Sequence, residues 1–187
     1  MFSDRTHGAL FIIGVIVGIV ILVMVVVGSR KKSLSLIPFK IAGKADIEMS
    51  DFRFISTKDG RVEWEIRAKS AEMFEQKHQA LLNDVDVKFN DNNGMDMALQ
   101  GEKGILDTVS KDFQVDNEKE PIRVLMDQEY HLYTSTLEWV NKTRQIQSAA
   151  PIQLEGPNLN IRGTGLRVNL ASQEIQVLHD VVAHFNR

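Results

Sequence analysis

The side chains of this sequence that could carry out acid–base chemistry are pairs of carboxylates two residues apart. Glu63 and Glu65 form one such pair, and Asp84 and Asp86 form another. Residues i and i+2 of a strand share a face, and apolar residues occupy the opposite face, so both pairs are predicted to face solvent. A glycosidase would instead hold two carboxylates across a cleft. We therefore interpret these carboxylates as solubilising charge.

Motifs for nucleotide, metal or covalent chemistry are missing from the sequence. Neither GEKGILDT nor GPNLNIRG ends in the Gly-Lys-Ser/Thr of a phosphate-binding loop, and there is no G-x-S-x-G, no H-E-x-x-H and no cysteine. His179 and His184 are five residues apart, which places them on opposite faces of a strand and makes them poor co-ligands for a metal ion. We expect a protein that is not an enzyme and that uses no metal and no cofactor.

One long apolar segment follows a short N-terminal tail, residues 1–8. Residues 9–27 contain no charge and suit a transmembrane anchor, since a helix needs about 20 apolar residues to cross a bilayer. A cleaved signal peptide is the alternative, but its apolar stretch is usually only about 7 to 15 residues long. Gly14 and Gly18 form a G-x-x-x-G step, which either lets another helix approach closely or only adds flexibility towards lipid.

Charge is divided sharply along the chain. The first 44 residues carry six basic residues and one acidic residue, a net charge of +5, and a basic juxtamembrane linker, residues 28–45, follows the apolar segment. Residues 45–187 carry 16 basic and 24 acidic residues, a net charge of −8. A domain this acidic repels a phosphate backbone, so we expect no nucleic-acid partner.

From residue 46 onwards, apolar side chains alternate with a period of two. The clearest run is RVEWEIRAK, residues 61–69, in which Trp64, Ile66 and Ala68 share one face and charged residues occupy the other. Turn signals such as Asp-Gly and Gly-Pro-Asn separate this run from similar ones, and no segment shows a sustained helical period. Residues 46–187 are therefore predicted to form one all-β domain of antiparallel strands.

These strands are also related by an internal repeat. Placing residues 99–115 over residues 161–177 aligns Gly101 with Gly163 and Gln-Val with Gln-Val. Residues 132–148 fit the same frame and residues 66–82 fit it more loosely, so the repeats begin at 66, 99, 132 and 161. A period near 30 residues, with two short strands in each copy, is typical of a stacked β architecture.

The inward face of the predicted strands is apolar throughout. Ordinary core packing and a groove lined for lipid both account for this pattern, and periodicity alone does not separate them. The residues that would line such a groove are Trp64, Ile66, Met73, Phe89, Met97, Leu99, Phe113, Val124, Leu132, Ile146, Leu154, Ile161 and Leu166.

The final strand, Val181–Phe185, ends two residues before the C-terminus. A terminal strand with no covering element exposes a row of unpaired N–H and C=O groups. We predict that this strand is a docking edge for a partner strand. The alternative is that His184 and the last two residues blunt the edge by polarity and charge.

Several short motifs follow one another in order along nearly the whole chain, after the single N-terminal span. They are W-x-I/L-x-A at Trp64, Ile66 and Ala68; an L-x-G stretch from Leu99 to Leu106; L-x-T-x-x-L-x-W at Leu132, Thr134, Leu137 and Trp139; I-x-S-x-x-P at Ile146, Ser148 and Pro151; and G-x-G-L at Gly163, Gly165 and Leu166. This arrangement resembles the family of the lipopolysaccharide-export component LptC, with its relatives LptA and the N-terminal part of LptD.

The resemblance implies an open β-jellyroll in which stacked antiparallel strands form a slot for acyl chains. It implies a single-pass anchor in the cell inner membrane, beside the ABC transporter of LptB, LptF and LptG, with the soluble domain in the periplasm. That domain would receive lipopolysaccharide from the transporter and pass it to LptA. Taken alone, the basic residues Arg30, Lys31 and Lys32 that follow the span argue for a cytoplasmic domain.

The resemblance also assigns roles to individual residues. The apolar residues named above would contact lipopolysaccharide, while Gly163 and Gly165 would hold backbone too crowded for side chains. The LptF and LptG subunits would be contacted by Gly14, Gly18, Ile47, Phe52 and Phe54, and an LptA-like protein by Ile175, Val177, Val181, Ala183 and Phe185. The alternative function is a membrane-tethered β-repeat scaffold that binds only protein, through its sheet edges.

Overall fold

The computed structural model describes residues 41, 43–90, 96–170 and 172–185. All of them belong to the second of two compact units, Leu36–Arg187. The predicted tail 1–8, the predicted span 9–27 with Gly14 and Gly18, and most of the predicted linker lie outside the described residues. Within the described part of the chain, no helix is long and apolar enough to cross a bilayer.

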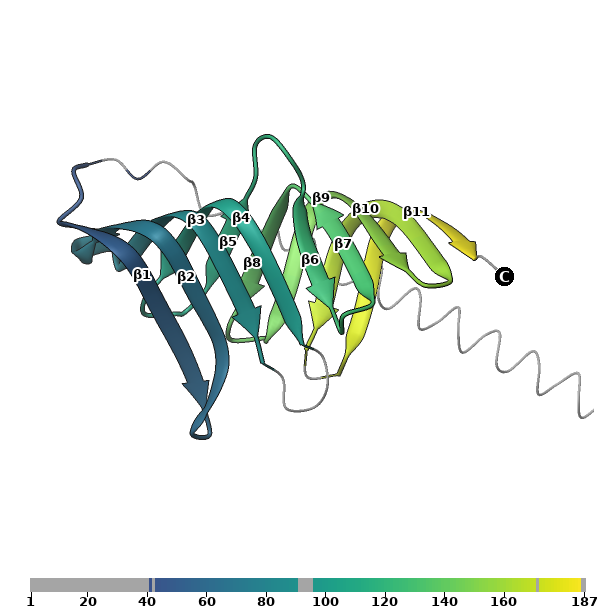
Figure 1. The fold of residues 1–187 in the computed structure, drawn as a ribbon, viewed down its shortest axis with the longest axis horizontal. Helices are drawn as coiled ribbons and strands as arrows, with labels where there is room; N and C mark the ends of the chain where they lie inside the picture. The colour runs from purple at the N-terminus through teal and green to yellow at the C-terminus, as the bar shows by residue number, and fades with distance from the viewer. Residues whose placement is uncertain (1–40, 42, 91–95, 171, 186–187) are drawn as a thin grey trace, which may run out of the picture. The chain divides into compact units, whose positions relative to one another are not determined.

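The described residues form one antiparallel sheet, which confirms the predicted all-β class (Figure 1). One short 3-10 helix, Glu75–Lys77, interrupts the strands. The strands are β1 Ile47–Lys58, β2 Arg61–Phe74, β3 Gln79–Phe89, β4 Met97–Asp107, β5 Phe113–Asp116, β6 Ile122–Met126, β7 Tyr130–Thr134, β8 Thr136–Val140, β9 Gln145–Gly156, β10 Leu159–Asn169 and β11 Glu174–Phe185.

The pairing of β4 and β9 folds this sheet into two layers. Residues 97–100 of β4 pair with β6, whereas residues 103–106 pair with β5. Likewise β9 pairs with β8 at one end and with β7 at the other. The strands β4, β5, β8, β9, β7 and β6 therefore close a ring of pairings, with a β6–β7 layer facing a β5–β8 layer (Figure 1).

Four of the long strands bend sharply at a single residue where they cross from one layer to the other. Asp51, Asp84, Gly165 and Asp180, on β1, β3, β10 and β11, each have a positive φ between 51° and 79°. Aspartate and glycine tolerate this left-handed conformation better than most residues do. The buried positions change phase at such a bend: on β3 they are even-numbered before Asp84 and odd-numbered after it. The predicted short strands are found as β5 to β8, with 4 or 5 residues each, whereas the other described strands run through the bend and have 11 to 14 residues.

The predicted repeat is visible in the backbone. His78, Lys111, Arg144 and Gln173 all have positive φ, and each follows the start of a predicted repeat by twelve residues. They lie in the turns at the free edge of the β5–β8 layer, and neighbouring turns are hydrogen-bonded to one another. The Thr108 N–H donates to the His78 carbonyl at 2.8 Å, and the Leu170 N–H donates to the Arg144 carbonyl at 3.3 Å.

Two glycines at equivalent repeat positions allow close packing against two equivalent valines. A Cβ added to Gly101 would lie 2.1 Å from Val115 Cγ1, and one added to Gly163 would lie 2.5 Å from Val177 Cγ1. At Gly163 the added atom would also lie 2.9 Å from the carbonyl oxygen of His179, which is backbone and cannot rotate away. Both contacts are far shorter than an ordinary carbon contact of about 3.5–4.0 Å.

We expect Gly101→Ala to destabilise the domain by about 1–3 kcal/mol, as overpacking does. Its nearest neighbours are side-chain atoms, so adding Val115→Ala should recover part of this loss. Gly163→Ala should cost a similar amount that Val177→Ala does not recover, because the His179 carbonyl still blocks the methyl group. Urea unfolding followed by tryptophan fluorescence measures all four variants. Full recovery in the second pair would contradict the backbone clash.

Candidate functional site

The predicted groove-lining residues meet in the space between the two layers. Eleven of the thirteen are buried in one continuous apolar core, and Met73 and Ile161 are partly buried against it. They come from every long strand except β1 and β11, together with β5, β6 and β7. The alternation along each strand therefore places these side chains on a common interior face.

An aromatic cluster joins the two layers across this interior. Trp64 and Phe89 belong to the part of β2 and β3 in the β6–β7 layer, whereas Phe113 and Trp139 belong to β5 and β8. The ring centroids of Trp64 and Phe113 are 5.2 Å apart, and those of Phe89 and Trp139 are 5.0 Å apart. Phe54 of β1 stacks on Trp64 at 5.6 Å. Phe54 had been predicted as a partner contact, and it also extends this cluster to the first strand.

Two polar atoms within the cluster lack partners. The indole N–H groups of Trp64 and Trp139 are buried and have no hydrogen-bond acceptor among the described residues. An unpaired buried donor costs roughly 1–3 kcal/mol. The interior is therefore apolar but contains two donors that no atom of the described residues accepts from.

The interior opens at its C-terminal end into an apolar groove of about 430 Å³. The groove brings together residues predicted for two different roles, Leu154 and Ile161 for lipid and Ile175, Val177 and Val181 for a partner. The residues completing it, which were not predicted as site residues, are Met126, Asp127, Tyr130 and Leu159. Asp127 and Tyr130 flank the turn between β6 and β7, so their contribution to the groove depends on tertiary structure that alternation does not report.

Both glycines predicted as structural residues lie beside this groove, on β10. Gly163 packs closely against Val177, as described above, and Gly165 has φ of 79°. A Cβ on Gly165 would lie 3.1 Å from Leu178 Cδ1. Together they allow β10 to bend against β11.

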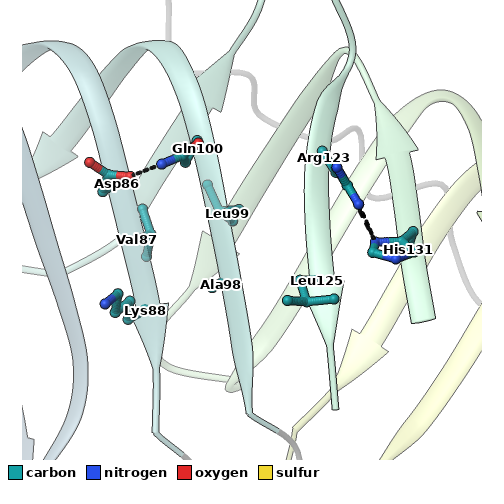
Figure 2. Close-up of a pocket in the computed structure, with 9 residues that line it drawn as sticks. All are labelled: Asp86, Val87, Lys88, Ala98, Leu99, Gln100, Arg123, Leu125 and His131. Carbon is teal, nitrogen blue, oxygen red and sulfur yellow. Dashed lines mark hydrogen bonds between the residues drawn. The ribbon is translucent and has the colours of Figure 1, made fainter. Parts of the chain in front are cut away.

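A second pocket, of about 260 Å³, lies on the outer face of the β6–β7 layer (Figure 2). The Gln100 amide donates to Asp86 Oδ1 at 2.7 Å, and Arg123 Nε donates to His131 Nδ1 at 3.3 Å. Figure 2 shows that these polar groups pair with each other across neighbouring strands. Because the polar side chains satisfy one another, this pocket has no pair of free groups arranged for acid–base chemistry. Among the described residues no three metal-binding side chains cluster.

The two edge strands differ in how much of their apolar surface is exposed. β1 and β11 each pair on one side only, with β2 and β10 respectively. On β1, Phe52 and Phe54 are partly buried while Ile47 is exposed. On β11, Val181 and Phe185 are 52% and 76% exposed, and Ala183 and Ile175 are also exposed, whereas Val177 is partly buried. The C-terminal edge is thus the more apolar and open of the two.

The carboxylates Glu63 and Glu65 are not simple solvent-face charges, and that interpretation was wrong. Their side chains are only 11% and 13% exposed, and each is held by arginine. Arg53 donates to both Glu65 oxygens, at 2.8 and 2.9 Å, and Arg67 donates to Oε1. These bonds from Arg53 and then Arg67 lower the pKa of Glu65 to about 2. The same contacts fasten the edge strand β1 to β2.

On the outer face of the β5–β8 layer, a third carboxylate is shifted in the opposite direction. Burial raises the pKa of Glu138 above its ordinary value, and the negative charge of Asp112 adds to this effect. A hydrogen bond from the Gln147 amide, at 3.0 Å, partly offsets it. The raised pKa of Glu138 is therefore caused mainly by burial, and no second carboxylate shares a proton with it among the described residues.

Comparison with known proteins agrees with this architecture. Residues 15–186 match the family described as lipopolysaccharide-assembly, LptC-related. Among solved structures, the chain is similar to LptH from Pseudomonas aeruginosa, described as the LptA-homologous periplasmic component of the lipopolysaccharide transport device. The TM-score is 0.53 at 12% identity, over 66% of this chain and 95% of that chain, which establishes a shared fold. No curated protein gave a match.

Glu65→Gln should weaken the domain at neutral pH and reduce the dependence of its stability on pH. A carboxyl group with a lowered pKa in the folded state stabilises above its ordinary pKa, near 4.5, and that contribution disappears as the pH falls towards 2. The free energies of unfolding of wild type and variant should therefore differ at pH 7 and converge near pH 2. Urea titrations between these pH values test this, with Glu72→Gln as a control on β2. A difference independent of pH would contradict the ion-pair explanation.

Proposed function

The chain belongs to the LptC-related family of lipopolysaccharide-assembly proteins, and we propose that it is the inner-membrane-anchored component that accepts lipopolysaccharide from the LptBFG transporter and passes it to an LptA-like periplasmic protein. A role in lipopolysaccharide transport follows from the family and from the LptA-like fold. The proposal adds that LptBFG is the donor of lipopolysaccharide and that an LptA-like protein is the acceptor.

The observation that carries this proposal is the apolar interior that opens into the groove beside β11. Each methylene removed from water contributes about 0.8 kcal/mol, so exposing an acyl chain of about 14 carbons costs on the order of 10 kcal/mol. A lipid crossing an aqueous compartment therefore needs continuous apolar cover. The groove offers such cover at Ile161 and Val177, where the interior is only partly filled by protein.

The two sheet edges supply the proposed connections. A strand of the LptA-like protein would pair with the free edge of β11. The free edge of β1, through Ile47 and Phe52, would pair in the same way with the LptF and LptG subunits. Support comes from the single-sided pairing of both strands. The predicted span 9–27 would anchor the chain in the inner membrane, with Gly14 and Gly18 against transporter helices and the β domain in the periplasm.

Photo-crosslinking tests the lipid path directly. A photoreactive residue at Ile161 should capture lipopolysaccharide in cells, whereas the same residue at the exposed Lys88 on the outer face should not. Trp64 and Phe113 are packed in the aromatic cluster, so capture there would require the cluster to open. Crosslinks from Ile161 to protein alone would favour the scaffold that binds only protein.

Proline substitutions at Val182 and Ala183 test the docking edge. The N–H groups of consecutive strand residues point to opposite sides, so one proline removes an outward donor and the other removes a donor to β10. We expect the outward one to weaken binding of the LptA-like protein about tenfold or more with little change in unfolding. The control variants Val182→Ala and Ala183→Ser keep both N–H groups and should bind the LptA-like protein normally. Retained binding in both proline variants would eliminate β11 as the docking edge.

A further inference from the structure

A third pocket, of about 300 Å³, lies between the free edges of the two layers, away from the groove beside β11. From the β6–β7 layer it is lined by the end of β1 and the start of β2, and from the β5–β8 layer by the β4–β5 and β8–β9 turns. The lining residues are Ser56, Thr57, Lys58, Glu63, Lys111, Asn141, Lys142 and Arg144. We call it the slot pocket.

The slot pocket is strongly cationic within an acidic domain. Lys58, Lys111, Lys142 and Arg144 face a single lining carboxylate, that of Glu63, so the pocket carries +4 and −1. The rest of the domain must then be more acidic than its net charge of −8 suggests. Three of the four cations come from two turns of the β5–β8 layer. These three side chains lie close together because the two turns stack on each other.

Arg144 is held at the centre of this arrangement. Its Nη1 lies 2.8 Å from Glu63 Oε1, which bridges the free edges of the two layers, and its side chain is only 24% exposed. The contact lacks the alignment of a hydrogen bond, since neither Glu63 Oε1 nor Arg144 Nε has a hydrogen-bond partner among the described residues. A guanidinium has five N–H donors, and the part of this side chain that remains exposed can pair with a further anionic acceptor.

The turns that carry these cations are fixed rather than loosely arranged. The Asn141 N–H donates to Asp112 Oδ1 at 2.8 Å, and the Asn141 amide donates to the Ser110 carbonyl at 3.0 Å. Asp112, an acidic side chain beside the pocket, is thereby occupied. Lys111 and Arg144 both have positive φ, of 64° and 52°. Non-glycine residues held in this region cost of order 1–3 kcal/mol and persist only where the surroundings enforce them.

The slot pocket also adjoins the apolar interior. Ser56 lines the pocket, is buried, and pairs across β1 and β2 with Trp64 of the aromatic cluster. The interior is closed at this point, since Trp64 is fully buried in the aromatic cluster, so the apolar part of a bound molecule enters the interior only when that cluster opens. Phosphate suits these cations, because guanidinium and ammonium donors form short, charge-assisted hydrogen bonds with its oxygens.

We propose that the slot pocket binds the phosphate group of an anionic amphiphile whose acyl chains enter the interior as the aromatic cluster opens. Lys111, Lys142 and Arg144 contact the phosphate oxygens, and Glu63 holds Arg144 until the phosphate replaces it. The identity of the acyl-bearing ligand rests on the function proposed above, whereas the cationic pocket is a separate site from the groove at Ile161.

The test measures binding of three probes to the full-length chain in detergent: bisphosphorylated lipid A, the same lipid after enzymatic dephosphorylation, and inorganic phosphate. The double variant Lys111→Gln and Lys142→Gln should bind phosphorylated lipid about tenfold or more weakly and dephosphorylated lipid as wild type does. The matched control, Lys69→Gln and Lys88→Gln, removes two exposed lysines elsewhere and should change neither affinity. Equal affinities of all proteins for phosphorylated lipid would overturn the proposal.

The remaining outcomes separate this site from the proposed function. If Ile161→Asp abolishes lipid binding but the lysine variants do not affect it, the lipid path stands and the phosphate site fails. If neither lipid binds wild type, both fail. Inorganic phosphate that binds the pocket without competing with lipid would identify a site for free phosphate and overturn the amphiphile proposal.

Glu63→Gln distinguishes a ligand site from a structural ion pair. Removing the carboxylate frees Arg144 for phosphate, so affinity for phosphorylated lipid should rise severalfold while affinity for dephosphorylated lipid stays constant. A purely structural ion pair predicts the opposite, a loss of affinity for both lipids as the two edges separate. Thermal unfolding of the variant shows whether the fold is retained, and a fall in affinity in a folded variant would overturn the proposal.

Discussion

The bend that carries each long strand from one layer into the other is the constraint on which this domain depends. A strand that continues straight can serve only one layer, and a strand that ends at the layer boundary leaves its hydrogen bonds unpaired. The left-handed residues Asp51, Asp84, Gly165 and Asp180 bend four of the long strands and so avoid both outcomes. They also shift the inward face by one residue, which keeps apolar side chains between the layers on both sides of the bend.

The packing between the two layers depends on this change of the inward face at each bend. At one end of the molecule, aromatic rings from both layers meet and fill the space, with Trp64 against Phe113. At the C-terminal end, mainly β11 contributes side chains from the β5–β8 layer, and the space between the layers remains an open groove. The same two-layer sheet is thus a packed core in one place and an open surface in another. Among the described residues, the free edges are bridged by one ion pair, Glu63 to Arg144, within the slot pocket.

The sequence was sufficient to predict what depends on local alternation and repetition. Strand identity, the inward residues of β2 to β4 and the spacing of the turns, 33, 33 and 29 residues, are all local or periodic properties. The phase reversal at Asp84 was not predictable, because a bend within one strand and a break between two strands look alike in one sequence. The contact of Glu63 with Arg144 joins residues from different layers, and Glu63 precedes the first predicted repeat. Alternation assigned Glu63 to solvent, since it reports the face of a strand and not what lies opposite that face.

The stacked turns at His78, Lys111, Arg144 and Gln173 have a consequence for how such domains change length during evolution. Each repeat contributes two strand widths to both layers, or about 10 Å along the sheet. Loss or gain of a single strand would reverse the chain direction and leave one turn without its neighbour. Duplication or deletion of a whole repeat preserves the direction, the bends and the turn-to-turn hydrogen bonds. The length of the sheltered interior is therefore expected to vary among relatives in steps of one repeat rather than continuously.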